Sequence, residues 1–147
     1  MSKFVQAVLV GLLVTFILDF FLFLGIFLNY INFYEIDLYY NILFADNQNW
    51  YLFFTLSLLI GSMIMYLKNY RVGLTLVGIL FLLVSLTLIE PIGLDIGKKV
   101  FMSQKVTIKS GKYSYVGDLI YNGREFLYLY DYKYKKIMKL NKKELHE

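Results

Sequence analysis

The chain has 147 residues, of which 59% are apolar and only 18% are charged, against roughly 45 to 50% and about 25% in an average soluble domain. This excess of apolar residues excludes an ordinary water-soluble globule. There is no cysteine, and the one histidine, His146, is the penultimate residue. Disulfide scaffolds, thiolate metal sites and histidine-based triads are therefore excluded or nearly so, and we expect neither a metal nor a cofactor.

The charge divides the chain into two parts. Residues 1–94 carry three basic and five acidic side chains, a net of −2, and residues 95–147 carry twelve basic and six acidic ones, a net of +6, which together give the formal +4. We therefore expect a transmembrane domain over 1–94 and a basic, tyrosine-rich β tail over 95–147.

The first predicted membrane span covers residues 4–28, where only Gln6 and Asp19 resist hydrocarbon. About 20 apolar residues suffice to cross a bilayer core, so this run predicts a transmembrane helix. A cleaved signal peptide is the alternative, because Lys3 precedes the run. The run is too long for that reading, and no small-x-small cleavage site follows it.

Two further spans are predicted over residues 51–67 and 72–90. Only the four residues 68–71 separate them, which predicts a tight turn and an antiparallel helical hairpin. The intervening stretch 29–50 is apolar but contains three acids and several tyrosines, which prefer the headgroup level. We expect an interfacial aromatic loop there, with a short helix lying on the surface. A fourth span is the alternative, but it would place acids in lipid.

The positions of lysine and arginine predict the orientation. Lys3, Lys68 and Arg71 lie on one side of the three predicted spans, and the loop 29–50 on the other side has no basic residue. This places the N-terminus in the cytoplasm and the tail outside. The basic residues of the tail argue for the reverse, and we favour the first arrangement because the first helix usually dominates. We expect a multi-pass protein of a bacterial cell inner membrane.

The tail shows short alternating runs separated by turn residues, which predict a small antiparallel sheet. Its expected shape is a meander or a small SH3/OB-like barrel, with a central strand over 125–132, where both faces carry large side chains. Asn122-Gly123 predicts a type I′ hairpin turn, and Ser110-Gly111-Lys112 a second turn. The four predicted strands cover residues 100–109, 113–121, 125–132 and 136–140.

Asp19 lies near the middle of the first predicted helix, where a carboxylate costs at least ~2.5 kcal/mol. Small and polar residues recur at every fourth position before it, so this helix face should point into the helix bundle. Ser57 and Ser85 fall at a similar depth in the other helices. The predicted intramembrane polar cluster consists of Thr15, Asp19, Ser57 and Ser85, on a stripe that begins with Ala7 and Gly11.

This cluster has two readings. In the first, a protonated Asp19 hydrogen-bonds to Ser or Thr and holds the helices together. In the second, Asp19 responds to protons or ions, or contacts a charged helix of another subunit. At the end of the third span, Glu90 and Pro91 predict a helix exit and hinge, which we favour over an acid–base pair of Glu90 with Asp95.

No nucleotide, metalloprotease or nucleophile motif is present. Lysines interleaved with tyrosines in the tail suit lipid headgroups, which we favour over nucleic acid, a partner that would require a cytoplasmic tail. We expect a small non-catalytic integral membrane protein that assembles with a membrane-protein partner or as a homo-oligomer. The alternative is an oligomeric transport or ion-coupling component centred on Asp19. A lipid-modifying enzyme is the least favoured hypothesis.

Overall fold

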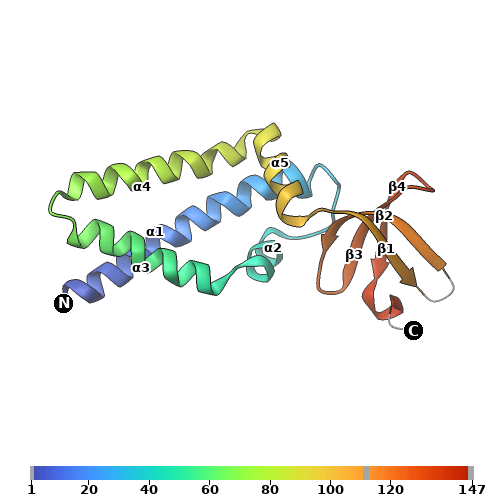
Figure 1. Ribbon diagram of the computed structural model, residues 1–147, viewed down its shortest axis with the longest axis horizontal. Helices are drawn as coiled ribbons and strands as arrows, with labels where there is room; N and C mark the ends of the chain where they lie inside the picture. The colour runs from blue at the N-terminus through green and yellow to red at the C-terminus, as the bar shows by residue number, and fades with distance from the viewer. Residues whose placement is uncertain (1, 111–112, 146–147) are drawn as a thin grey trace.

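The computed structural model of the chain describes residues 2–110 and 113–145. His146 and most of the turn predicted at 110–112 therefore lie outside the described residues. The described chain has five α-helices followed by a four-stranded antiparallel sheet. Figure 1 shows an elongated molecule, with three long helices at the end that carries the N-terminus and the sheet at the opposite end.

Helix α1 (Lys3–Ile26) continues through one π-helical segment, η1 (Phe27–Ile31), so that the helical run has 29 residues. The Ser2 side chain caps its start by accepting a hydrogen bond from the backbone N of Val5. At 1.5 Å per residue the run is ~43 Å long, which exceeds the ~30 Å hydrocarbon core of a bilayer. Helix α1 can therefore cross a membrane and still project beyond it.

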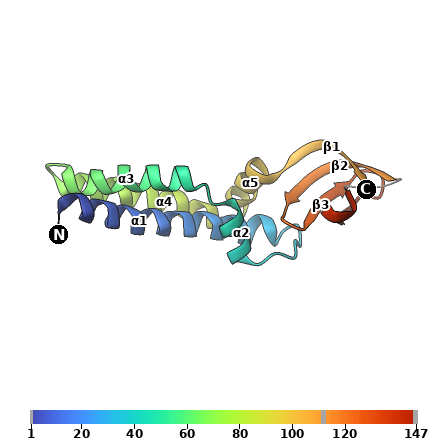
Figure 2. The ribbon, with the colours of Figure 1, turned by 90° about the horizontal axis from the view of Figure 1, so that it is seen from below.

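Helix α2 (Tyr40–Asn47) is short and is followed by α3 (Trp50–Tyr66), and the two meet at a bend of 84°. Asn69 caps the start of α4 (Tyr70–Ser85), which ends in the 3-10 turn η2 (Leu86–Leu88). Figures 1 and 2 show α1, α3 and α4 side by side, with the α3–α4 turn near the N-terminus. Two helical runs are long and apolar enough to cross a membrane, or three if α2 and α3 form one bent span.

Helix α5 (Glu90–Phe101) corrects the sequence analysis, which ended the helical part at Pro91 and began a strand at Val100. Pro91 lies in the first turn of α5, where the backbone N–H groups have no partner within the helix, so the missing amide hydrogen of proline costs nothing there. Pro91 therefore follows the end of one helix and lies at the start of the next. Glu90 in the first turn and two lysines in the last turn suit the helix dipole.

The sheet has the strand order β1-β2-β3-β4, and every neighbouring pair is antiparallel. It is an open meander, so the closed-barrel alternative was wrong. The strand β3 pairs on both sides, as expected for a segment with large side chains on both faces. A short 3-10 turn, η3 (Lys142–Leu145), follows the last strand. The strands are β1 (Ser103–Ser110), β2 (Tyr113–Asn122), β3 (Phe126–Asp131) and β4 (Lys136–Asn141).

The β2–β3 hairpin is present, but its turn differs from the prediction. Asn122 remains in the ladder opposite Leu127, and the backbone N of Gly123 donates to Phe126 O at 3.0 Å. Arg124 and Glu125 therefore form the tip. Neither Asn122 nor Gly123 has a φ in the left-handed range that a type I′ turn requires, so the predicted type I′ turn at these two residues was wrong.

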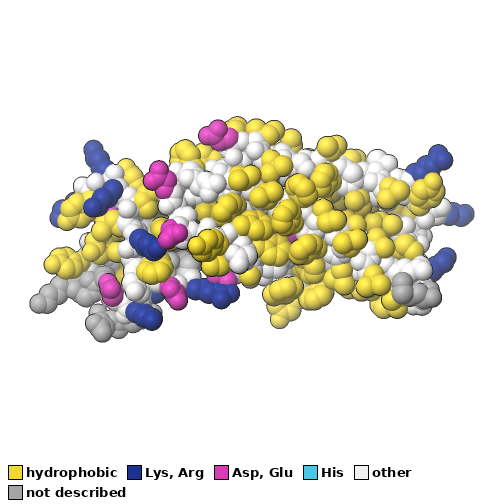
Figure 3. All heavy atoms as spheres, turned by 180° about the vertical axis from the view of Figure 1, so that it is seen from behind, with side chains coloured by type: hydrophobic (Ala, Val, Ile, Leu, Met, Phe, Trp, Pro, Cys, Tyr) yellow, Lys and Arg dark blue, Asp and Glu magenta, His cyan; other side chains and the backbone are white. Residues whose placement is uncertain are grey.

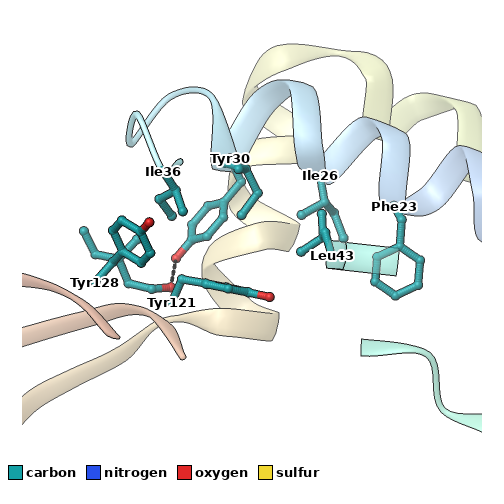
Figure 4. Close-up of a cluster of buried hydrophobic side chains, with 9 residues drawn as sticks. Phe23, Ile26, Tyr30, Ile36, Leu43, Tyr121 and Tyr128 are labelled. Carbon is teal, nitrogen blue, oxygen red and sulfur yellow. Dashed lines mark hydrogen bonds between the residues drawn. The ribbon is translucent and has the colours of Figure 1, made fainter. Parts of the chain in front are cut away.

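The main hydrophobic core crosses the junction between the helices and the sheet. Figure 4 shows side chains from α1, the following loop and α2 meeting those of the sheet. Phe101 and Met102 add to it from the end of α5. The sheet is therefore packed directly onto the helical part. The buried members of this core are Phe23, Ile26, Tyr30, Ile31, Ile36, Leu43, Ile120, Tyr121 and Tyr128.

Candidate functional site

The surface of the long helices is apolar. Figure 3 shows hydrophobic side chains covering the middle of the helical part, with Lys and Arg gathered towards the two ends of the molecule. On α4 only Gly73 is buried, and Leu82 is 67% exposed. Soluble proteins rarely expose so extended an apolar surface, which marks contact with a membrane or with another protein.

Helices α1 and α3 pack through their small residues. A Cβ added to Gly11 would overlap the backbone carbonyl of Ser57, and one added to Gly61 would overlap the carbonyl of Ala7. Such close backbone contact is typical of packed membrane helices. The stripe of small and polar residues on α1 therefore points into the bundle, as the sequence predicted.

Asp19 is half-buried at the sheet-side end of this interface. Its Oδ2 accepts a 2.8 Å hydrogen bond from Nε2 of Gln48, which lies at the bend between α2 and α3. Nearby, the hydroxyl of Tyr40 donates to Phe20 O at 3.0 Å. The bond to Gln48 ties α1 to the bend between α2 and α3.

The other members of the predicted polar cluster do not bond to Asp19. Ser57 Oγ donates to Phe53 O and Ser85 Oγ to Phe81 O, each at 2.7 Å and each within its own helix. Thr15 is 1% exposed, and its Oγ1 has no hydrogen-bond partner among the described residues, nor has Oε1 of Gln48. The structure thus places Asp19 beside Gln48 rather than in a hydrogen-bonded cluster with the serines.

Tyr30 connects α1 to the sheet. Its hydroxyl donates a 2.7 Å hydrogen bond to the carbonyl of Ile120, and both residues are fully buried. The β2–β3 register slips between Leu119 and Tyr121, so Ile120 is the extra residue of a β-bulge. A bulge leaves one residue out of the ladder, and Tyr30 satisfies the carbonyl that this bulge exposes (Figure 4).

Helix α5 completes this junction through two buried glycines. A Cβ on Gly97 would overlap the ring of Tyr30, and one on Gly93 would overlap the carbonyl of Thr87. The side-chain Nδ2 of Asn29 donates to that same carbonyl at 2.8 Å. These contacts fix α5, and with it the start of β1, against the end of α1. Glu90 and Pro91 are exposed at the start of α5.

A groove of about 570 Å³ opens between α2 and the sheet. Two ion pairs join its walls: Arg124 of the β2–β3 tip to Asp46 of α2, and Lys139 Nζ of β4 to Asp37 Oδ2 at 3.3 Å. Lys139 also lies over the ring of Phe126, 4.4 Å from its centroid. We refer to this feature as the α2–sheet groove.

Tyr121 forms part of the floor of the α2–sheet groove. Its hydroxyl accepts a 3.2 Å hydrogen bond from Asn47 Nδ2, and burial raises the pKa of this hydroxyl above its ordinary value. The Tyr121 side chain is 1% exposed, so its bond to Asn47 joins α2 to β2 beneath the groove.

Sequence reasoning missed Gln48, Tyr30 and Arg124 as contact residues. Gln48 carried a weak signal, since a polar amide beside Asn47 and Asn49 interrupts two apolar runs. Tyr30 and Arg124 carried none, because their partners are 90 and 78 positions away in the chain, counted from the residue numbers.

In comparisons with known proteins, no family model matches the chain, no curated protein is significantly similar to it, and no solved structure shows a significant match.

Proposed function

We propose that the chain is a small non-catalytic integral membrane protein of a cell inner membrane, in which α1, α3 and α4 span the bilayer. Its sheet serves as the contact surface for a partner membrane protein. The observation that carries the proposal is the continuous core between α1 and the sheet, centred on the Tyr30–Ile120 hydrogen bond. A sheet packed in this way has a fixed height and orientation at the membrane surface.

The positions of polar and aromatic residues indicate where the two membrane surfaces would cross the helices. Lys3, Lys68 and Arg71 are exposed near the end opposite the sheet. If one membrane surface lies at Lys3, the second lies ~30 Å further along α1, at about residue 23. Asp19 then lies ~6 Å below that surface, close enough to the headgroups for a polar pair with Gln48. Exposed aromatic residues at the start of α3, Trp50 and Tyr51, suit the same level.

The exposed tyrosines of the sheet are the proposed contact residues. Tyr113, the first residue of β2, is 71% exposed, and Tyr134 in the β3–β4 turn is 56% exposed; both lie at the end of the sheet away from the helices (Figure 1). Tyrosine is enriched at protein interfaces because its ring is rigid and apolar and its hydroxyl remains polar. We propose the orientation with the N-terminus in the cytoplasm and the sheet outside.

Photocrosslinking in cells tests this function. A photoreactive phenylalanine analogue replaces Tyr113 or Tyr134, and the control position is the exposed Leu82 of α4. We expect adducts of defined mass that contain another membrane protein from the two sheet positions and not from Leu82. Defined protein adducts from Leu82 alone would contradict the proposal, because the partner would then bind the helices.

A second candidate is an oligomeric transport or ion-coupling component centred on Asp19. The observation that favours it is the pair of buried oxygens without partners among the described residues, Thr15 Oγ1 and Gln48 Oε1, near an intramembrane carboxylate. Substitution of Asp19, argued in the Discussion, distinguishes this candidate from the first.

A further inference from the structure

We propose that the α2–sheet groove binds the zwitterionic headgroup of a phospholipid, with its phosphate at Arg124 and its ammonium group at Glu125. This inference rests on the proposed function, since a chain embedded in the bilayer places the groove beside the headgroups. The groove begins at α2, which the 84° bend turns away from the membrane-spanning direction of α3. Lipid headgroups are then the most abundant ligands at its mouth.

The size of the groove suits a small ligand. Its volume of about 570 Å³ falls within the range of roughly 300 to 1,000 Å³ that is common for ligand sites. Residues from α2 form one wall, and the β2–β3 tip with β4 forms the other. The aromatic residues that line it are Tyr39, Tyr121, Phe126 and Tyr128.

The phosphate position follows from the donors that Arg124 retains. Its side chain is 73% exposed and contacts Asp46 through one terminal nitrogen, Nη2. A guanidinium has five N–H donors in a planar fork, so donors remain for a phosphate while the ion pair to Asp46 persists. Asp46 itself is only 11% exposed, which fixes the arginine at the groove.

The ammonium position follows from the one acidic side chain of the groove that has no ion pair among the described residues. Asp46 is paired with Arg124 and Asp37 with Lys139, whereas the exposed Glu125 forms no ion pair within the described part of the chain. Its carboxylate can accept hydrogen bonds from an ammonium group. The ammonium of Lys139 already lies over the rings of Phe126 and Tyr128, 4.4 and 5.8 Å from their centroids, so a second cation is directed to Glu125 and not to these rings.

The balance of charge favours a zwitterionic headgroup over an anionic one. Three acids (Asp37, Asp46, Glu125) and two basic residues (Arg124, Lys139) line the groove, a net of −1. A headgroup with only negative charge would add to that excess. A phosphate joined to an ammonium by two carbons meets both signs, and phosphoethanolamine has this chemistry.

Native mass spectrometry of the purified full chain in detergent tests the assignment. The protein is mixed with equal amounts of dioleoyl phosphatidylethanolamine and dioleoyl phosphatidylglycerol. We expect the wild type to retain the ethanolamine lipid at least 10-fold over the glycerol lipid. Glu125→Lys, at the exposed hairpin tip, should reverse this preference, because it removes the ammonium site and makes the groove net positive.

The matched control is Asp95→Lys, which makes the same change of charge on an exposed face of α5 outside the groove. It should keep the wild-type preference. Equal retention of the two lipids by the wild type would overturn the assignment, as would an equal response of the Glu125 and Asp95 variants.

Soluble glycerophosphoethanolamine distinguishes a lipid from a free small molecule. If the lipid is the ligand, millimolar amounts of the soluble compound should displace less than half of the bound lipid. Complete displacement at that concentration would assign the groove to a free phosphoethanolamine compound and overturn the lipid assignment. A chain that fractionates with membranes but shows no headgroup preference contradicts this inference alone. A chain recovered without detergent in the soluble fraction contradicts the proposed function as well.

Discussion

The hydroxyl of Tyr30, at the end of the first helix, donates a 2.7 Å hydrogen bond to the backbone carbonyl of Ile120, the bulged residue of β2. The bond joins the helical part to the sheet across a core in which both residues are fully buried. It gives the sheet its position relative to the long apolar helices. The β-bulge and Tyr30 therefore act together to hold the sheet against the first helix.

Removing the Tyr30 hydroxyl should loosen the junction. Tyr30→Phe keeps the ring but leaves the Ile120 carbonyl buried without its donor, which should cost about 1 to 3 kcal/mol of stability. The measurement is thermal unfolding of the purified full chain in detergent. The control Tyr39→Phe alters a side chain that is 74% exposed and should leave the midpoint unchanged. An unchanged midpoint for Tyr30→Phe would show that the bond does not hold the junction.

Two glycine substitutions should have opposite outcomes. Gly11→Ala places a methyl group against the backbone of Ser57, so α1 and α3 must move apart. This should lower the stability of the protein by about 1 to 3 kcal/mol. Gly78→Ala on α4 meets nothing within 4 Å among the described residues and should be neutral or stabilising by up to about 1 kcal/mol. Circular dichroism melting in detergent measures both. Similar effects of the two substitutions would mean that α1 and α3 do not pack as described.

Asp19 variants separate a structural carboxylate from one that must ionise. Asn keeps the hydrogen-bonding capacity towards Gln48, whereas Leu deletes it and should weaken helix packing by roughly 1 kcal/mol. Asp19→Asn should therefore be tolerated in both membrane abundance and the phenotype of a deletion strain. An Asn variant that is abundant but inactive would favour the ion-coupling candidate, because an amide cannot ionise.

A single substitution at a residue with a left-handed backbone conformation should stabilise the sheet. Lys135, in the β3–β4 turn, has φ of 51°, a left-handed conformation that costs a non-glycine residue roughly 1 to 2 kcal/mol. Lys135→Gly should raise the stability of the full chain by up to about 1 kcal/mol, after the entropic cost of glycine. Lys136→Gly, one position later in β4, should lower it by about 0.5 to 1 kcal/mol. A destabilising Lys135→Gly would mean that the turn adopts another conformation.

The helices and strands could be predicted because their signals are local. Apolar runs indicated three long helices, and alternating runs indicated four strands close to those observed. Helix α5 was missed because Pro91 was interpreted as an end, although a proline suits the first turn of a new helix. The hairpin tip was misplaced by two residues because Asn122-Gly123 is a strong turn signal, yet the pairing of Asn122 with Leu127 extends the ladder past it.

The candidate site was less predictable than the fold. The packing face of α1 followed from the spacing of Ala7, Gly11 and Thr15, since a helix repeats every 3.6 residues. The hydrogen-bond partner of Asp19 could not be predicted in this way. Matching positions along straight helices suggested Ser57 and Ser85, whereas the 84° bend between α2 and α3 brings Gln48 to the carboxylate. The α2–sheet groove depends on contacts between α2 and strands some 80 residues later, as in the Asp46–Arg124 pair, and no local pattern encodes them.

Cysteine labelling can show whether the sheet and the α3–α4 turn lie on opposite sides of a membrane, since the chain has no cysteine of its own. Lys68→Cys marks the α3–α4 turn and Tyr134→Cys marks the sheet, and a membrane-impermeant maleimide is applied to intact spheroplasts and to permeabilised ones. We expect Tyr134→Cys to be labelled in intact spheroplasts and Lys68→Cys only after permeabilisation. Labelling of both positions in intact spheroplasts would contradict it, because the two ends of the molecule would then lie on one side of the membrane.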